Sequence, residues 1–231
     1  MEFTFILVEP AVPGNVGASA RALKTMGFNR LMVVNSDVHL LPEARWLAHG
    51  SADILDSIVK YDTLSEAVSG MDMVIGTTAK KRRVHSDHYL CSEIPGLISG
   101  KSGMLNNVAL VFGREESGLT NEELKLCNIF SRIPMHGKYP SLNLSQSVML
   151  YAWELARFDI ISSVPAETPT TKVPARGKYK HLRIMVEGLL RRLGFDDKSA
   201  FYCRVMERLE VVGDKDAGLL LSVCSRVEEI F

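Results

Sequence analysis

The sequence predicts an α/β fold in which a mostly parallel sheet carries helices on both faces. Short apolar, β-rich runs alternate with helical patterns up to about residue 160, and this alternation is typical of parallel strands joined by helices. Beyond residue 177 the apolar spacing is helical throughout, which predicts a small all-α unit at the C-terminus. The 231 residues are 46% hydrophobic, which is enough for a sizeable core.

Each element follows from a local pattern. Apolar runs predict strands over residues 3–8, 30–35, 72–78 and 106–113, and a short strand over 131–135. Apolar positions three or four residues apart predict helices over 12–26, 42–55, 62–71, 92–98 and 142–158. The first helix should stop at Gly27, the second should break at Gly50, and the third should be capped by Asp62 or Thr63.

The chain is expected to have two folded parts. Residues 163–177 are rich in proline, threonine and serine without apolar periodicity, which is typical of a linker. Amphipathic patterns then predict helices over 181–193, 197–211 and 214–231. The expected division is a domain of residues 1–162, a linker of residues 163–177 and a helical extension of residues 178–231.

Charge and cysteine content narrow the class of protein. The formal net charge is zero, which argues against a purely electrostatic nucleic-acid binder but leaves room for a local basic patch. We expect no signal peptide, because the first residues lead directly into a strand pattern, and no membrane span, because no apolar run reaches about 18 residues. The four scattered cysteines favour a reduced, cytoplasmic protein. His85 and His88 lack partners at ligand spacing, so no metal is expected.

Four segments carry small or polar residues near predicted strand ends, where ligands of parallel α/β sheets bind. They are PGNVGASAR at residues 13–21, GTTAKKRR at 76–83, GREESGLTNEE at 113–123 and PMHGKYPSLN at 134–143. Taken singly, each has an ordinary explanation, because a glycine after a strand is most often a turn and a basic run is most often a solvated surface. None of them matches the phosphate-binding GK[ST] pattern, GxGxxG, HExxH or GxSxG.

In combination and in this order, the segments resemble the SpoU-class (SPOUT) RNA 2′-O-ribose methyltransferases, nearest to their TrmJ-like and LasT-like branch. The resemblance covers residues 3 to about 160. It rests on motif one, PGNVGASARALKTMGF, motif two, LVFGREESGLTNEEL, and motif three, IPMHGKYPSLNLSQSV. Three motifs in order are far more specific than any one of them.

The resemblance implies a knotted fold and a cofactor. In this family motifs two and three form a deep trefoil knot, a rare exception to unknotted chains, and the knot holds S-adenosylmethionine. Gly113 would let the backbone approach the cofactor where a side chain would collide. Glu115 and Asn143 would tie the knot loops together, with Gly118 as a further structural residue. The other cofactor-binding residues implied are Thr77, Thr78, Ala79, Ile133, Pro140, Ser141 and Leu142.

The resemblance also implies catalytic residues. A ribose 2′-hydroxyl is a poor nucleophile, so the protein must position it in line and help to remove its proton. Arg21 is the catalytic residue implied, with Asn15 and Ser145 holding the arrangement. A guanidinium with a pKa above about 12 is a poor base, so we expect Arg21 to orient the adjacent phosphate and to stabilise the developing alkoxide.

RNA and a second copy of the chain are the expected partners. In the family the site lies at a dimer interface, and the apolar residues of the long helix, including Val148, Met149, Ala152 and Trp153, suggest a homodimer. Candidate RNA contacts are Lys80, Lys81, Arg82, Arg83, Lys178, Lys180 and Arg183. The alternative for the C-terminal helices is a dimer-packing or solvated appendage. The region also departs from the tRNA-binding relatives, because ERLEVVGDKDAG is acidic and mixed where they have a basic helix.

The expected function is S-adenosylmethionine-dependent methylation of a ribose 2′-hydroxyl in tRNA or rRNA, with tRNA favoured. The alternative is an RNA-binding protein of the same fold with lost or narrowed activity. Intact Asn15, Arg21, Gly113 and Ser145 favour the enzyme. A dinucleotide-dependent dehydrogenase is disfavoured by the missing glycine fingerprint.

Overall fold

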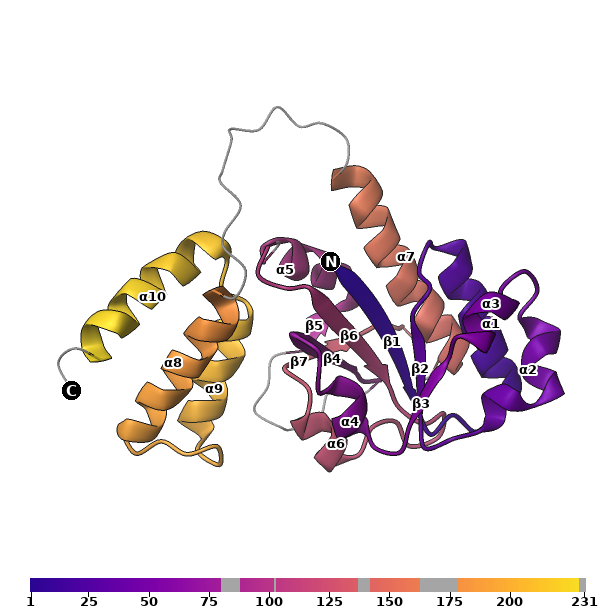
Figure 1. The fold of residues 1–231 in the computed structure, drawn as a ribbon, viewed down its shortest axis with the longest axis horizontal. Helices are drawn as coiled ribbons and strands as arrows, with labels where there is room; N and C mark the ends of the chain where they lie inside the picture. Colours follow the sequence, from indigo (N-terminus) through magenta and orange to yellow (C-terminus); the bar gives the residue numbers. More distant parts are fainter. Residues whose placement is uncertain (80–87, 102, 137–141, 163–177, 229–231) are drawn as a thin grey trace.

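The computed structural model describes residues 1–79, 88–101, 103–136, 142–162 and 178–228 (Figure 1). Its centre is a seven-stranded sheet of order β3-β2-β1-β6-β4-β7-β5, and every described strand pair is parallel. The strands are β1 (Glu2–Val8), β2 (Leu31–Val34), β3 (Val59–Tyr61), β4 (Met73–Thr77), β5 (His88–Leu90), β6 (Asn107–Phe112) and β7 (Ile129–Arg132). The predicted α/β class with a parallel sheet is confirmed, and the trefoil knot stays a prediction.

The sheet is covered on both faces because its central strands are apolar on both. Phe5 and Leu7 of β1 join one buried cluster, whereas the alternate residues Ile6 and Val8 join another. The first cluster is covered by α1 (Pro13–Thr25), α5 (Ile94–Ser99) and α7 (Leu144–Ser162), with α2 (Pro42–Leu47) and α3 (Ala52–Asp56) packed beside α1. The second cluster is covered by α4 (Leu64–Val68) and α6 (Asn121–Lys125).

Most predicted boundaries agree with the structure, including the break at Gly50 and a capping box at Thr63. The bounds of the strand predicted over 131–135 are wrong. It begins at Ile129, which pairs with Ile75 of β4, and its last paired residue is Arg132. Five short elements were not predicted from the sequence: β3, β5, α6 and the 3-10 turns η1 (Val38–Leu40) and η2 (Cys91–Glu93). Elements of three to five residues are too short to show a period.

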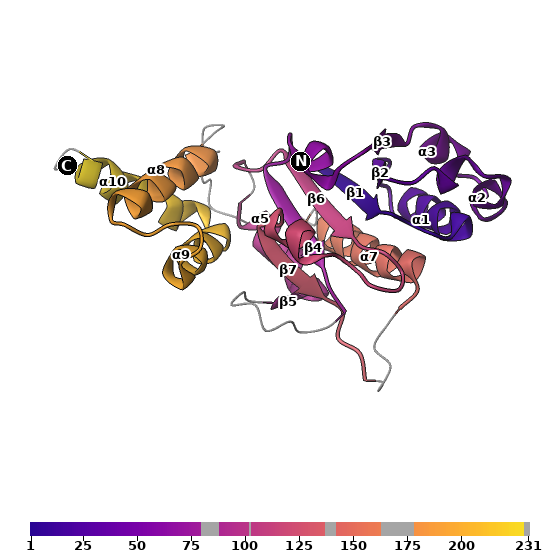
Figure 2. The same ribbon diagram turned by 90° about the horizontal axis from the view of Figure 1, so that it is seen from below.

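The C-terminal helices lie at the α5 side of the sheet, away from α2 and α3 (Figures 1 and 2). They are α8 (Lys178–Arg192), α9 (Ala200–Glu210) and α10 (Asp214–Glu228). The predicted linker, residues 163–177, is outside the described residues, so the domain boundaries stay a prediction. None of the helices described is long and apolar enough to span a membrane.

A buried lysine marks the contact between the two parts of the chain. Lys101 follows α5 and is 1% exposed. Its Nζ donates a hydrogen bond to the carbonyl oxygen of Leu209 at 3.3 Å, lies 3.9 Å from the Glu210 carboxylate and 4.0 Å from the centre of the Tyr179 ring. Burial lowers the pKa of Lys101 to about 8, with Glu210 opposing the shift and Arg183 adding to it.

This lysine predicts a pH dependence of stability. Between about pH 8 and 10 the unfolded chain keeps the Lys101 proton whereas the folded chain releases it, so its contribution to the free energy of unfolding should rise with pH. The slope should approach about 1.4 kcal/mol per pH unit. Urea unfolding of the parent and of Lys101→Met across this range should show that the difference in stability changes in favour of the parent. A difference that is flat with pH would contradict a lowered pKa of Lys101 in the folded chain.

Candidate active site

A cavity of about 510 Å³ opens at the carboxyl ends of β4, β6 and β7. Three chain segments far apart in sequence form its walls: residues 77–79 at the end of β4, residues 112–119 at the end of β6, and a third group after β7. The described members of that group are Ile133, Met135, Leu142, Leu144, Ser147 and Tyr151. This is the place where parallel sheets bind ligands, and the volume suits a cofactor.

Most predicted cofactor-binding residues lie on this cavity. The lining includes Thr77, Thr78, Ala79, Gly113, Ile133 and Leu142, together with Glu115 and Gly118. Pro140 and Ser141 are outside the described residues. Thr77 is fixed by a hydrogen bond from its hydroxyl to the carbonyl oxygen of Val111, 2.9 Å away, so the ends of β4 and β6 are tied together beneath the cavity.

Gly113 is required because the backbone of the same turn passes close to it. A Cβ at this position would lie 2.2 Å from the carbonyl carbon of Gly118 and 2.3 Å from the amide nitrogen of Leu119. The space is therefore filled by the protein's own backbone, not by the open cavity. Gly118 closes the turn with φ +69°, a conformation that favours glycine, and its amide donates to the carbonyl oxygen of Arg114.

Glu115 connects this turn to the first helix. Its carboxylate accepts hydrogen bonds from the backbone amides of Ala11 and Val12, at 3.1 and 3.3 Å, and from the Asn15 side-chain amide at 2.9 Å. Helix α1 has no capping side chain and no acid in its own first turn. Glu115, 100 residues away from Asn15 in sequence, supplies the missing negative charge at this helix N-terminus.

The same chain of hydrogen bonds reaches motif three. Asn143 donates from its side-chain amide to Oδ1 of Asn15 at 2.8 Å, and its own Oδ1 accepts from the amide and the hydroxyl of Ser145. Residues of all three motifs are therefore joined as Glu115–Asn15–Asn143–Ser145. Burial disfavours the charged form of Glu115, but the hydrogen bonds from Asn15, Ala11 and Val12 outweigh it and lower its pKa.

None of the three predicted catalytic residues is among the residues that line the cavity. Asn15 is buried and Ser145 half-buried within the hydrogen-bonded chain. Arg21 is exposed farther along α1, and its side chain makes no hydrogen bond or ion pair with any residue that the structure describes. The structure thus groups two of the three predicted catalytic residues and leaves Arg21 apart from them.

Several lining residues were missed from sequence. Tyr151 is 1% exposed, stacks edge-to-face on Phe112 and donates to the hydroxyl of the buried Ser131 at 2.8 Å. Burial raises the pKa of Tyr151 well above its ordinary value, so it stays a neutral donor. Leu144, Ser147 and Tyr151 also line the cavity, and their spacing of three and four residues was the signal available.

The candidate RNA contacts are only partly described. Lys80, Lys81, Arg82 and Arg83 are outside the described residues, as is the side chain of Lys178. Lys180 is exposed, and Nε of Arg183 lies 3.8 Å from the Glu210 carboxylate. Among the described residues, no group of three or more His, Cys, Asp or Glu side chains is placed to hold a metal ion.

The fold and the cavity define a parallel α/β protein with a cofactor-sized site at the carboxyl ends of its central strands. Residues 2–153 match the SpoU rRNA Methylase family. The chain is 39% identical over 229 residues to the uncharacterised tRNA/rRNA methyltransferase LasT of Escherichia coli K12, covering 99% of this chain and 98% of LasT. It therefore belongs to the SpoU rRNA methylase family, and the predicted resemblance is confirmed.

Two further relatives support the same placement. The tRNA (cytidine/uridine-2′-O-)-methyltransferase TrmJ of Pectobacterium atrosepticum is 34% identical over 206 residues, which are 88% of this chain and 85% of TrmJ. The solved structure of a probable methylase family protein from Haemophilus influenzae Rd KW20 superposes with a TM-score of 0.69 at 29% identity, covering 98% of this chain and 96% of that one.

The close approach at Gly113 gives a prediction. Gly113→Ala should open the turn, because the added methyl group would overlap the backbone of Gly118 and Leu119, and binding of S-adenosylhomocysteine should be lost in calorimetry. Gly96→Ala is the matched control, since nothing lies within 4 Å of a Cβ there. Equal affinities for Gly113→Ala and the parent would show that the turn does not form the binding wall.

Proposed function

We propose that this protein transfers a methyl group from S-adenosylmethionine to a ribose 2′-hydroxyl of RNA. Membership of the SpoU family supports the reaction class, and the relative TrmJ is named for the same chemistry on cytidine and uridine of tRNA. The single observation that carries the proposal is the hydrogen-bonded chain from Glu115 through Asn15 and Asn143 to Ser145, which brings all three motifs together beside one cavity.

The cavity fits the cofactor in chemistry as well as in volume. Phe112, Ile133 and Leu142 offer apolar contact for a flat base, and the segment from Thr77 to Ala79 offers main-chain groups. Glu116 also lines the cavity, and a carboxylate suits a cationic sulfonium. When bound, S-adenosylmethionine would supply the activated methyl group. Pro140 and Ser141 remain part of the proposed binding set.

The chain's own residues would position the hydroxyl. Arg21 would hold the neighbouring phosphate and stabilise the developing alkoxide, because a guanidinium donates fixed hydrogen bonds but does not accept a proton at neutral pH. Asn15 and Ser145, fixed through Asn143, would keep the start of α1 and the start of α7 in register. The proton would pass to phosphate or water.

Arg21 would act across a homodimer interface. It does not line the cavity of its own chain, although α1 begins directly beside that cavity. Val148 and Ala152 are fully buried in the protomer's own core, so these two side chains are not available to a dimer interface. Trp153, 44% exposed on α7, and Trp46 and Leu47 on α2 are the apolar side chains that a second copy would cover.

RNA is the proposed partner of α8, and a tRNA is the favoured substrate by likeness to TrmJ. Lys180 is exposed on this helix and has no acidic partner among the described residues. An RNA substrate also supports the proposed cytoplasmic location. An RNA-binding protein of this fold with lost or narrowed activity stays the second candidate, because the motifs bear on binding as well as on transfer.

One experiment separates the two candidates. The protein is incubated with methyl-labelled S-adenosylmethionine and total RNA of the host, and the RNA is then cleaved with alkali. A methylated 2′-hydroxyl cannot attack the adjacent phosphate, so label should remain in alkali-resistant dinucleotides. RNA that is bound without any labelling would support the second candidate, and label in alkali-sensitive mononucleotides would indicate base methylation.

A catalytic role for Arg21 predicts a selective loss. Arg21→Ala should lower methyl transfer roughly a hundredfold or more, the scale of one preorganised electrostatic group, and leave the affinity for S-adenosylhomocysteine unchanged. Lys24→Ala, one turn further along α1, is the control. If Arg21 acts across the interface, mixing Arg21→Ala with Gly113→Ala should restore activity through heterodimers with one intact site. No recovery would place Arg21 in its own subunit's site.

A role for α8 in RNA binding predicts a change in salt dependence. Lys180→Gln should reduce the slope of log affinity against log salt by about 0.7 to 0.9 if one phosphate contact is lost. Lys198→Gln, exposed beyond the same helix, is the control. A point variant is preferable to truncation, because removing the C-terminal helices would also uncover Lys101. An unchanged slope would favour a packing role for α8.

A further inference from the structure

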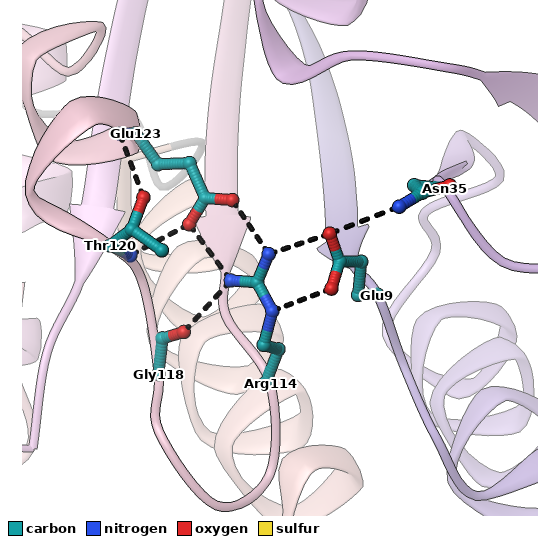
Figure 3. Close-up of polar contacts among 6 residues, drawn as sticks. All are labelled: Glu9, Asn35, Arg114, Gly118, Thr120 and Glu123. Carbon is teal, nitrogen blue, oxygen red and sulfur yellow. Dashed lines mark hydrogen bonds and ion pairs between the residues drawn. The ribbon is translucent and has the colours of Figure 1, made fainter.

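The side chain of Arg114 is held between two carboxylates on the side of the motif-two turn that faces β1 and α6 (Figure 3). Its Nε and Nη2 contact the two oxygens of Glu9, each at 2.7 Å. Its Nη1 and Nη2 donate to the two oxygens of Glu123, each at 3.0 Å. Nη1 also reaches the carbonyl oxygen of Gly118 at 3.4 Å.

These contacts use all five N–H groups of the guanidinium. Arg114 is 22% exposed, so its two ion pairs are partly shielded from water. The hydrogen bonds to Glu9 and then to Glu123 raise the pKa of Arg114 further above its ordinary value, which keeps it charged at every relevant pH. A guanidinium with every donor engaged and two carboxylates beside it is not available to an RNA phosphate or to a substrate proton.

The two carboxylates belong to segments that need to be held. Glu9 directly follows β1 and Asn35 directly follows β2, and both have positive φ, at 45° and 49°. The Asn35 side-chain amide donates to Glu9, so the two strained residues are linked. On the other side, Glu123 forms the capping box of α6 with Thr120. One side chain of the turn thus joins the ends of two strands to the start of a helix.

Arg114 and its neighbour Glu115 hold the same loop from opposite ends. Arg114 binds Glu9 at the start of the β1–α1 loop, and Glu115 binds Ala11 and Val12 at its end. The turn that these two residues begin forms one wall of the cavity. A loose turn would lower the fraction of molecules with a binding-competent wall, and the measured affinity would fall by that fraction.

We infer that Arg114 is a positioning residue: by clamping Glu9 and Glu123 it fixes the cavity wall of residues 113–119 against the start of α1. The inference rests on the proposed function in naming the cofactor, but the clamp itself is a property of the loop. Lysine cannot replace arginine here, because a single ammonium nitrogen cannot form bidentate hydrogen bonds to two carboxylates as a planar guanidinium does.

The first test uses binding and not turnover. Arg114→Lys should weaken S-adenosylhomocysteine in calorimetry roughly tenfold, the size of one lost charge-assisted hydrogen bond. Glu9→Gln and Glu123→Gln should act in the same direction. Because the three residues work as one unit, each glutamine variant combined with Arg114→Lys should weaken binding by less than the product of the separate effects.

Two controls separate positioning from a general loss of stability. Val108→Ala removes fully buried volume at the other end of β6, so it should lower the melting temperature and leave the affinity unchanged. Arg30→Lys alters an ion pair with Glu2 at the amino end of β1, away from the cavity. An Arg114→Lys protein that melts earlier and binds as tightly as the parent would overturn the inference, as would equal losses of affinity in Arg114→Lys and Val108→Ala.

Hydrogen exchange gives a readout that does not depend on the cofactor. Arg114→Lys should increase exchange in residues 9–15 and 113–119 together, without a change in β3 or α4. Faster exchange in neither segment, or in 113–119 alone, would show that Arg114 does not fix the β1–α1 loop. If the parent protein binds no S-adenosylhomocysteine, the proposed function fails, and the exchange pattern still decides whether the clamp exists.

Discussion

The carboxylate of Glu115 is the interaction on which the site depends. It lies at the N-terminus of α1, where it accepts hydrogen bonds from the two amides that precede the helix and from Asn15, which is 100 residues earlier in the sequence. Each charge-assisted hydrogen bond of this kind contributes about 1.5–3 kcal/mol. Arg114 and Glu115 are therefore more than part of a solvated turn, because both bind the chain segment that follows β1, whereas their neighbour Glu116 is exposed.

Much of this arrangement was predictable from the sequence. The runs at β1 and β6 are apolar on both faces, and the family motifs indicated the segments around Gly113 and Leu142 as cavity walls. What could not be predicted is pairing at long range. Arg114 meets Glu9 across 105 residues, and nothing in the sequence distinguishes Glu9 from any other acid after a strand. Gly113 was predicted to allow a close approach to the cofactor. The structure has a close approach there, but the neighbouring atoms are the backbone of Gly118 and Leu119.

The site also shows why the start of a helix and the lining of a cavity can depend on one another. Asn15 connects to Glu115 on one side and to Asn143 on the other, so a shift of the wall would be passed to α1 and α7 through a few short hydrogen bonds. Tyr151 and Ser131 form a buried pair beneath the cavity and limit how far α7 can move.

The burial of Lys101 has a consequence for the order in which the molecule is assembled during synthesis. Its hydrogen-bond acceptor, the Leu209 carbonyl, is added 108 residues later. Domains generally fold as units from the N-terminus while the ribosome is still adding residues. The sheet can thus form while this ammonium group is still hydrated, and the water around it is removed only when α9 is complete. Closing this contact removes water from two charged groups together, because the Glu210 carboxylate beside Lys101 is almost fully buried as well.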